Sequence, residues 1–168
     1  MRPLIPALLV VALAILVVAC APVEPSPVPS PTASPVQASP NPDLVEFEER
    51  LDEASSRLGQ LVRSLGAASA GSQRELGLVA AQLGAFAVDE LAWLDDHPAD
   101  ACYSDVADEY RAGLTDIAES AAAFAELAAA ASPPGDVEGQ AAAQSLSAGI
   151  AALQQAATLA RGARAACR

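Results

Sequence analysis

Leucine recurs at every seventh position from residue 44 to residue 65 of this 168-residue chain. A second apolar row repeats between the leucines with the same period, and the two rows are Leu44, Leu51, Leu58 and Leu65 with Phe47, Ala54, Leu61 and Ala68. Residues at this spacing share one face of an α-helix, which has to pack against another element. The pattern predicts a helix that begins at a capping box of Asp43 and Glu46 and ends before Gly71.

Three more stripes of this kind predict three further helices. The second helix is expected to begin at a capping box of Ser72 and Glu75, and its stripe is Leu76, Val79 or Ala80, Leu83, Phe86 or Ala87, Leu91 and Leu94. The third follows the polar break at residues 95–100 and carries two heptad rows, Tyr103, Tyr110, Ile117, Phe124 and Ala131 with Ala107, Leu114, Ala121 and Ala128. The fourth is expected to be capped by Asp136, and its stripe is Leu146, Ile150, Leu153, Ala157, Ala160 and Cys167.

Four amphipathic helices joined by short breaks predict an all-α domain over residues 44–168, an antiparallel up-down four-helix bundle. Alanine is abundant in the stripes, and glycines are scattered among them, namely Gly59, Gly77, Gly84, Gly113, Gly149 and Gly162. We expect the helices to approach one another closely, although each glycine costs up to ~1 kcal/mol relative to alanine.

The first twenty residues have the order of parts of a secretory leader. Arg2 is followed by an apolar stretch that ends at Val17-Val18-Ala19-Cys20. An uncleaved membrane anchor is the alternative, but the stretch is shorter than the ~20 apolar residues that a spanning helix needs. The last four residues resemble the lipobox of bacterial lipoproteins. This resemblance implies cleavage before Cys20, a diacylglyceryl group on its thiol, and anchoring at the extracytoplasmic face of the cell membrane, or of the outer membrane in a diderm organism.

The next segment predicts a spacer. Residues 20–43 carry eight prolines, which are Pro22, Pro25, Pro27, Pro29, Pro31, Pro35, Pro40 and Pro42. Such a segment cannot build a core, and it favours an extended, semi-rigid chain that reaches about 70 Å at ~3.1 Å per residue. The predicted organisation is therefore a signal peptide at 1–19, a lipidated cysteine with a disordered proline-rich linker at 20–43, and the bundle at 44–168.

The two remaining cysteines, Cys102 and Cys167, are expected to form a disulfide in an oxidising compartment. Cys102 lies at the start of the third predicted helix and Cys167 at the end of the fourth, so both fall at the same end of an antiparallel hairpin. Closing this loop should stabilise the fold by roughly 4 kcal/mol. Free thiols or a cysteine metal site are the alternatives, but the sequence has no CxxC motif or histidine pair to support a metal site.

The charge of the chain restricts its partners. The net charge is −12 at pH 7, which argues against binding nucleic acid. Few residues are aromatic, so a stacking surface for bases or sugars is not expected. The partners that remain are the membrane, through the lipid on Cys20, and another protein of the cell envelope.

Acidic residues concentrate around the break between the second and third helices. Ca²⁺ prefers six to eight oxygen ligands, and the candidate ligands for a divalent cation are Asp95, Asp96, His97, Asp100 and Asp105. The alternative is a solvated acidic rim. In that interpretation Asp96 and Asp100 cap the third helix, and arginines from the fourth helix, Arg161, Arg164 and Arg168, pair with the acids.

No catalytic constellation is evident in the sequence. His97 is the single histidine, which excludes a multi-histidine metal site, and no GxSxG motif is present. Hydrolysis by paired carboxylates is left as an alternative, although an alanine-packed bundle predicts no cleft for a substrate. Glu90 falls near the buried stripe of the second helix, where we expect it to lie at the edge and to reach solvent or an arginine.

These observations predict a lipid-anchored extracytoplasmic protein that acts as a binding or structural module without catalysis. The alternative function is binding of a divalent cation or a small ligand at the acidic end.

Overall fold

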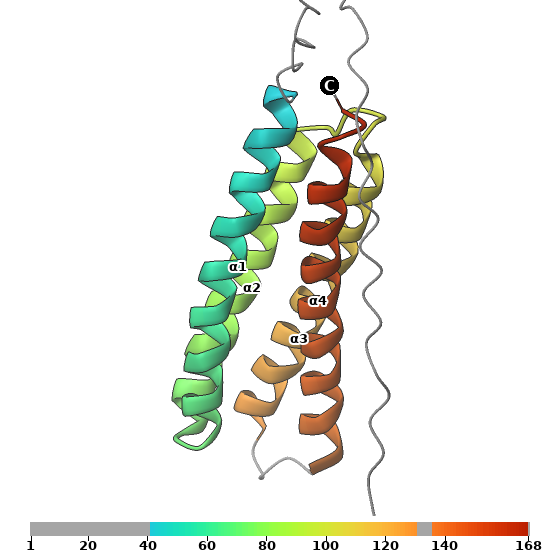
Figure 1. Ribbon diagram of the computed structural model, residues 1–168. Coiled ribbons are helices and arrows are strands. Elements are labelled where there is room, and N and C mark those ends of the chain that lie inside the picture. The colour runs from blue at the N-terminus through green and yellow to red at the C-terminus, as the bar shows by residue number, and fades with distance from the viewer. Residues whose placement is uncertain (1–40, 131–135, 168) are drawn as a thin grey trace, which may run out of the picture. The chain divides into compact units, whose positions relative to one another are not determined.

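The computed structural model describes residues 41–130 and 136–167 of the chain. Four helices follow one another, α1 at Pro42–Ser69, α2 at Gln73–Asp96, α3 at Ser104–Ala129 and α4 at Asp136–Ala163. Figure 1 shows them running alternately up and down, with α1 beside α2 and α3 beside α4. The predicted all-α four-helix bundle is confirmed. The predicted leader, Cys20 and most of the linker lie outside the described residues, as do Ala131 and Arg168.

The core of the bundle is built from the predicted stripes. On α1, seven of the eight stripe residues are buried and Leu61 is partly buried. On α3, the side chains of Tyr110, Leu114 and Ile117 are fully enclosed. The heptad spacing thus identified the buried faces correctly, because a period near 3.6 residues places these side chains on one side of each helix.

The predicted helix starts are correct in one case and wrong in two. Ser72 and Glu75 form the expected capping box at α2, and their hydrogen bonds lower the pKa of the Glu75 carboxyl. At α1, however, the cap is Asn41, whose side chain accepts a hydrogen bond from the backbone N–H of Asp43 at 2.9 Å. This leaves Pro42 at the first helical position, where its missing N–H costs nothing.

At α3 the expected aspartate caps are absent from the helix start. The residue in the cap position is Tyr103, and its side chain makes no capping hydrogen bond. Asp96 is the last residue of α2. Asp100 lies in the turn, where its carboxylate accepts a hydrogen bond from the N–H of Ala101. Because α3 begins only at Ser104, Asp100 lies three residues and Asp96 seven residues before the cap position.

The predicted close approach of helices occurs chiefly between α3 and α4. A Cβ atom added to Gly113 would lie 2.8 Å from the carbonyl oxygen of Gly149. One added to Gly149 would lie 2.7 Å from the carbonyl oxygen of Gly113. The two backbones therefore cross in direct contact. By contrast, Gly162 has no neighbour within 4 Å of an added Cβ, and Gly59 has only the end of Arg63 at 3.7 Å.

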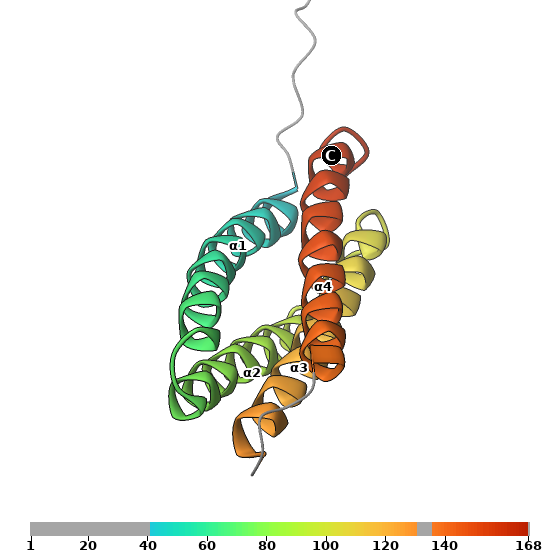
Figure 2. The same cartoon turned by 90° about the horizontal axis from the view of Figure 1, so that it is seen from below.

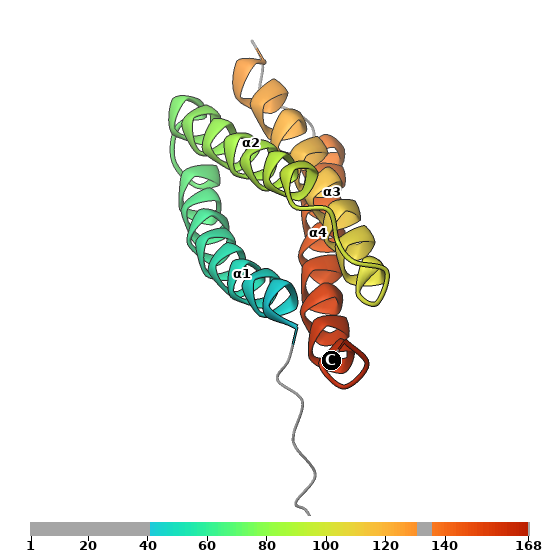
Figure 3. The ribbon, with the colours of Figure 1, turned by 90° about the horizontal axis from the view of Figure 1, so that it is seen from above.

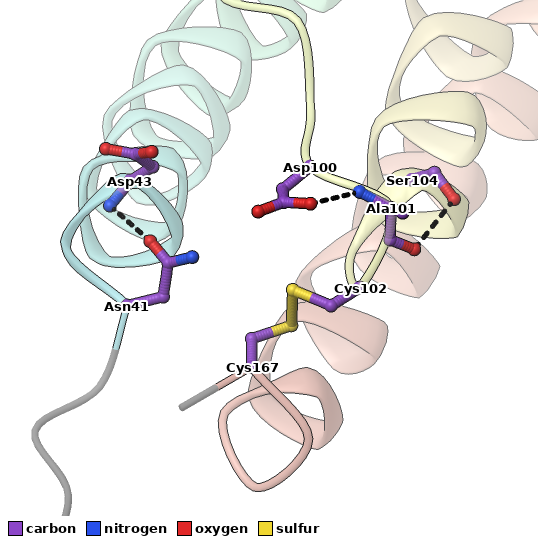
Figure 4. The surroundings of a disulfide bond; sticks show 7 residues. All are labelled: Asn41, Asp43, Asp100, Ala101, Cys102, Ser104 and Cys167. Carbon is purple, nitrogen blue, oxygen red and sulfur yellow. Dashed lines mark hydrogen bonds between the residues drawn. A yellow bond between two sulfur atoms is a disulfide. The ribbon is translucent and has the colours of Figure 1, made fainter.

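The predicted disulfide is confirmed. Cys102 and Cys167 are bonded, with their Cα atoms 5.6 Å apart, in the turn before α3 and just after α4 (Figure 4). The backbone N–H of Asn41 also donates to the carbonyl oxygen of Cys167 at 3.3 Å. The start of α1, the start of α3 and the end of α4 are thereby joined at one end of the bundle, which we call the disulfide end.

Candidate functional site

A carboxylate lies inside the bundle among three helices. Glu90 of α2 is 2 % exposed, and Arg50 of α1 binds it in a bidentate manner, with Nε donating to Oε2 at 2.7 Å and Nη2 donating to Oε1 at 2.9 Å. The hydroxyl of Tyr110 from α3 donates to Oε2 at 2.9 Å. We call Arg50, Glu90 and Tyr110 the Glu90 cluster. It connects α1, α2 and α3 through charge-assisted hydrogen bonds.

The environment of the Glu90 cluster raises the pKa values of both of its donors. Burial, with the adjacent Glu90 charge, raises the pKa of the Tyr110 phenol far above its usual value. Burial alone would lower the pKa of Arg50, but the bond and the charge of Glu90 outweigh it and the pKa is raised. The guanidinium also lies over the ring of Trp93, 5.5 Å from its centroid. The Glu90 carboxylate therefore accepts hydrogen bonds from one cationic donor and one neutral donor, and these bonds link three helices.

Glu90 lies only partly where the sequence predicts it. It reaches an arginine, as expected, but it lies in the core and not at the edge of the stripe. The reason is helical spacing, because Glu90 follows Phe86 by four residues and precedes Leu94 by four, and both of these are buried. The signal that could have found the cluster is Arg50 itself, which follows buried Phe47 by three residues on α1.

A second ion pair joins α1 to α4 at the disulfide end. The carboxylate of Glu48, which is 8 % exposed, accepts from Nε of Arg164 at 2.7 Å. One interpretation predicted that Arg164 pairs with the acids between α2 and α3. Instead, Arg164 pairs with Glu48 on α1. The guanidinium of Arg161 donates to the hydroxyl of Thr158 on its own helix.

The candidate cation ligands are spread over the end of α2, the following turn and the first turn of α3. Asp95 pairs with Arg111 at 2.8 Å, and Asp96 and Asp105 are exposed. Asp100 is engaged with the N–H of Ala101. Across residues 41–130 and 136–167, no three His, Cys, Asp or Glu side chains lie together in a way that could hold a metal ion. The cation prediction therefore gains no support from the positions of these residues.

His97 belongs to an aromatic cluster. Its ring is stacked on Trp93 with the centroids 4.6 Å apart, and its Nδ1 lies 2.8 Å from the carbonyl oxygen of Trp93. Because a carbonyl can only accept, this contact places a proton on Nδ1. Phe47 makes edge contacts with Trp93, Tyr103 and Tyr110. His97 therefore caps the end of α2 and packs against Trp93.

A small cleft opens beside this aromatic cluster. It has a volume of about 180 Å³ and is lined by Asp43, Glu46, Phe47, Trp93, His97, Pro98 and Tyr103. Phe47 and Tyr103 are 2 % and 4 % exposed, so they contribute little accessible surface. Sites for small molecules generally have volumes of about 300–1,000 Å³. The cleft is too small to be the main ligand site.

The outward face of α2 carries a row of apolar residues that was not predicted from the sequence. All members of this row, which we call the outer α2 row, are exposed, namely Leu78, Ala81, Ala85, Val88 and Ala92. Leu78 is 59 % exposed and Val88 is 62 % exposed. Their spacing of three and four residues was readable in the sequence, but the buried stripe of α2 has the same period and concealed it.

The length and hydropathy of α2 also match those of a membrane-spanning helix, and α2 is the one such helix in the described part of the chain. Its residues Leu83, Phe86 and Ala87 are fully buried in the bundle. A core helix with an apolar outer face accounts for both observations.

Comparison of the chain with known protein families, with curated proteins and with solved structures gave no significant match. The function of the chain is therefore inferred from the residues and contacts described above.

Proposed function

We propose that this protein is a lipid-anchored extracytoplasmic module that acts by binding another envelope protein and not by catalysis. The lipobox-like leader and the proline-rich linker support the anchored location. The chemistry of the interior supports the absence of catalysis. In the described part of the chain, every buried side-chain nitrogen or oxygen has a hydrogen-bond partner. Glu48, Glu90 and Ser120 are thereby committed to holding helices together.

The outer α2 row is the single observation that carries the proposal. Exposed apolar side chains in a contiguous row on one helix are typical of an interaction surface. Three of the five residues in the row are alanines, which allow a second helix to approach closely. Burial of Leu78 and Val88 against it would supply the hydrophobic contribution, at roughly 25 cal/mol per Å² of apolar surface.

The charges beside the row indicate the chemistry of the partner. Asp89, Asp95 and Asp96 are exposed along the second half of α2, where Asp89 and Asp95 form exposed ion pairs with Arg57 and Arg111. An amphipathic helix with basic residues flanking its apolar stripe complements this surface, since charge complementarity favours both encounter and orientation. A second copy of the chain fits less well, because the chain is strongly acidic.

Site-specific photocrosslinking tests the interaction. A photoreactive residue replaces Ala85 in the full chain within the native envelope, and crosslinked peptides are identified by mass spectrometry. We expect one major adduct, from a basic amphipathic helix, that is lost in the double variant Leu78→Glu and Val88→Glu. Val137→Glu is the matched control, because Val137 is 75 % exposed on α4. Loss of the adduct in the control, or an adduct with a second copy of this chain, would contradict the proposal.

Detergent-phase partitioning tests the anchor separately. The natural protein should enter the detergent phase of Triton X-114, and Cys20→Ser should move it to the aqueous phase, because stable anchoring needs two or more acyl chains. If the natural protein is found in the aqueous phase, the proposed anchored location is wrong, whatever the result of the crosslinking.

A further inference from the structure

The seam between α1 and α4 is closed at one end and open further along. At the disulfide end it is held by the Glu48–Arg164 pair and by the hydrogen bond from Asn41 to Cys167. Figures 2 and 3 show α1 starting beside the end of α4 and then running away from it towards α2. Below the closed end, the two helices therefore diverge.

A groove occupies the open part of this seam. Its volume is about 370 Å³, and its lining residues are Ser55, Leu58, Gly59, Val62 and Arg63 from α1 with Ile150, Leu153 and Gln154 from α4. Leu58 and Leu153 are core residues that form its floor, at 4 % and 2 % exposed. Val62 and Ile150 are partly buried and pack against the core. The groove is thus an apolar surface depression between α1 and α4, at a place where the two helices do not cover the core completely.

The one charged residue in the lining is Arg63. It forms no ion pair within residues 41–130 and 136–167, in a chain whose net charge is −12. Its guanidinium extends over Gly59, because a Cβ added to Gly59 would lie 3.7 Å from Nη1 of Arg63. An exposed cation therefore stands at the mouth of an apolar groove, which is the arrangement that complements a molecule with an apolar body and an anionic end.

The size of the groove decides between classes of occupant. Its volume lies within the range of about 300–1,000 Å³ that is usual for small-molecule sites. An α-helix of about 10–12 Å diameter would fit for only about one turn, so a docked helix is disfavoured. A single hydrocarbon chain has the narrow, extended shape that the space between two diverging helices offers.

We infer that this groove binds one fatty acid, with its chain along Leu58, Val62, Ile150 and Leu153 and its carboxylate at Arg63. This inference does not depend on the proposed function, because the groove is formed by α1 and α4 whereas the outer row is on α2. A larger groove of about 530 Å³ lies between α3 and α4. Its lining includes Glu126 and Glu138, which would repel a carboxylate.

The inference is tested by titrating the purified chain in a calorimeter with decanoate below its micelle concentration and with decanol below its solubility limit. The chain carries Cys20→Ser, so that no acyl group of its own can fill the groove. We expect saturable binding of one decanoate per chain. Decanol should bind more weakly, by about tenfold, because it lacks the charge that Arg63 binds. The absence of saturable binding would overturn the inference.

Two glycines on α1 allow a matched test of the location. Gly59→Leu should fill the groove and abolish binding, and it should fold because the site of its Cβ is open and leucine favours helix more than glycine. Gly66→Leu is the control, since nothing lies within 4 Å of its added Cβ and it is outside the groove. Circular dichroism melting verifies that both are folded. Retained binding in Gly59→Leu, or equal loss in Gly66→Leu, would contradict the site.

The role of the charge is tested by Arg63→Gln, with Arg74→Gln as the control of equal charge. Arg63→Gln should weaken decanoate by about tenfold and leave decanol unchanged. Equal weakening by both variants would show a general effect of net charge, and the assignment of the carboxylate to Arg63 would be wrong.

Discussion

Glu90 shows how one residue can determine the relation of three helices. A buried carboxylate is costly unless it is paired and hydrogen-bonded. Arg50 and Tyr110 supply three donors to it. Since these donors come from α1 and α3, the carboxylate selects the rotation of both helices that brings them together. The Glu90 cluster therefore specifies how the three helices are oriented, in addition to stabilising the fold.

Tyr110→Phe tests the cluster at the scale of one residue. Loss of the hydroxyl should destabilise the fold at pH 7 by about 1–3 kcal/mol, because Glu90 loses a donor inside the core. The raised pKa of Tyr110 adds a pH dependence. The stabilising contribution of the Tyr110 hydroxyl is complete below about pH 10, the pKa of tyrosine in the unfolded chain. It decreases as the pH rises above that value, because the phenol ionises in the unfolded chain before it ionises in the fold.

Urea denaturation from pH 7 to pH 11 measures both effects. The natural protein should lose stability above pH 10 more steeply than Tyr110→Phe. Tyr103→Phe is the control, because its hydroxyl makes no hydrogen bond to the Glu90 cluster. If the natural protein and Tyr110→Phe lose stability in parallel, Tyr110 does not carry the alkaline dependence.

At the scale of the element, the contact between α3 and α4 differs from the other helix contacts. Gly113 and Gly149 bring the backbones together, and the buried hydroxyl of Ser120 donates across the interface to the carbonyl of Ala142 at 2.8 Å. A bond from a side chain of one helix to the backbone of the next requires this close approach. The small residues therefore determine the distance between α3 and α4.

Gly113→Ala should separate the two helices. The new Cβ would lie 2.5 Å from Cδ1 of Leu153 and 2.8 Å from the backbone oxygen of Gly149, and the backbone cannot move aside locally. We expect a net loss of about 1–3 kcal/mol in the free energy of unfolding, even though alanine favours helix. Gly66→Ala, with open space around it, should instead stabilise by up to about 1 kcal/mol. Urea denaturation compares them, and a stabilised Gly113→Ala would refute the close contact.

At the scale of the whole molecule, the bundle is held most firmly at the disulfide end. The disulfide closes α3 and α4, the Asn41 bond adds the start of α1, and Glu48 with Arg164 adds a second link between α1 and α4. The opposite part of the α1–α4 seam has the groove in place of such links. This difference allows one end to remain fixed while the seam admits an apolar molecule.

Removing the disulfide should weaken the whole bundle. The double variant Cys102→Ser and Cys167→Ser is expected to lower the free energy of unfolding by about 2–4 kcal/mol, because the unfolded chain regains the freedom of a long loop. Thermal melting of the variant and of the reduced natural protein should agree, and the variant should not respond to reductant. A natural protein that melts at the same temperature with and without reductant would contradict this expectation.

The features predicted correctly from the sequence are those that depend on neighbouring residues along the chain. The heptad rows identified the buried faces, and Ser72 with Glu75 identified the start of α2, because helical spacing and capping are local. The pairing of Cys102 with Cys167 also followed, since an antiparallel hairpin places them at one end. The predictions failed at Asn41, Tyr103 and Arg164, where a shift of two or three residues or a partner on another helix changes the outcome.

The sequence by itself therefore determined the number of helices, the face that each one buries and the bundle that follows. Only the tertiary structure decided which charges meet inside that bundle, where α1 leaves α4, and that the second apolar face of α2 stays exposed. The physical reason is that periodicity specifies a face but not the rotation and separation of two packed helices. Those depend on which side chains fit between them, as Glu90 with Arg50 and Gly113 with Gly149 show.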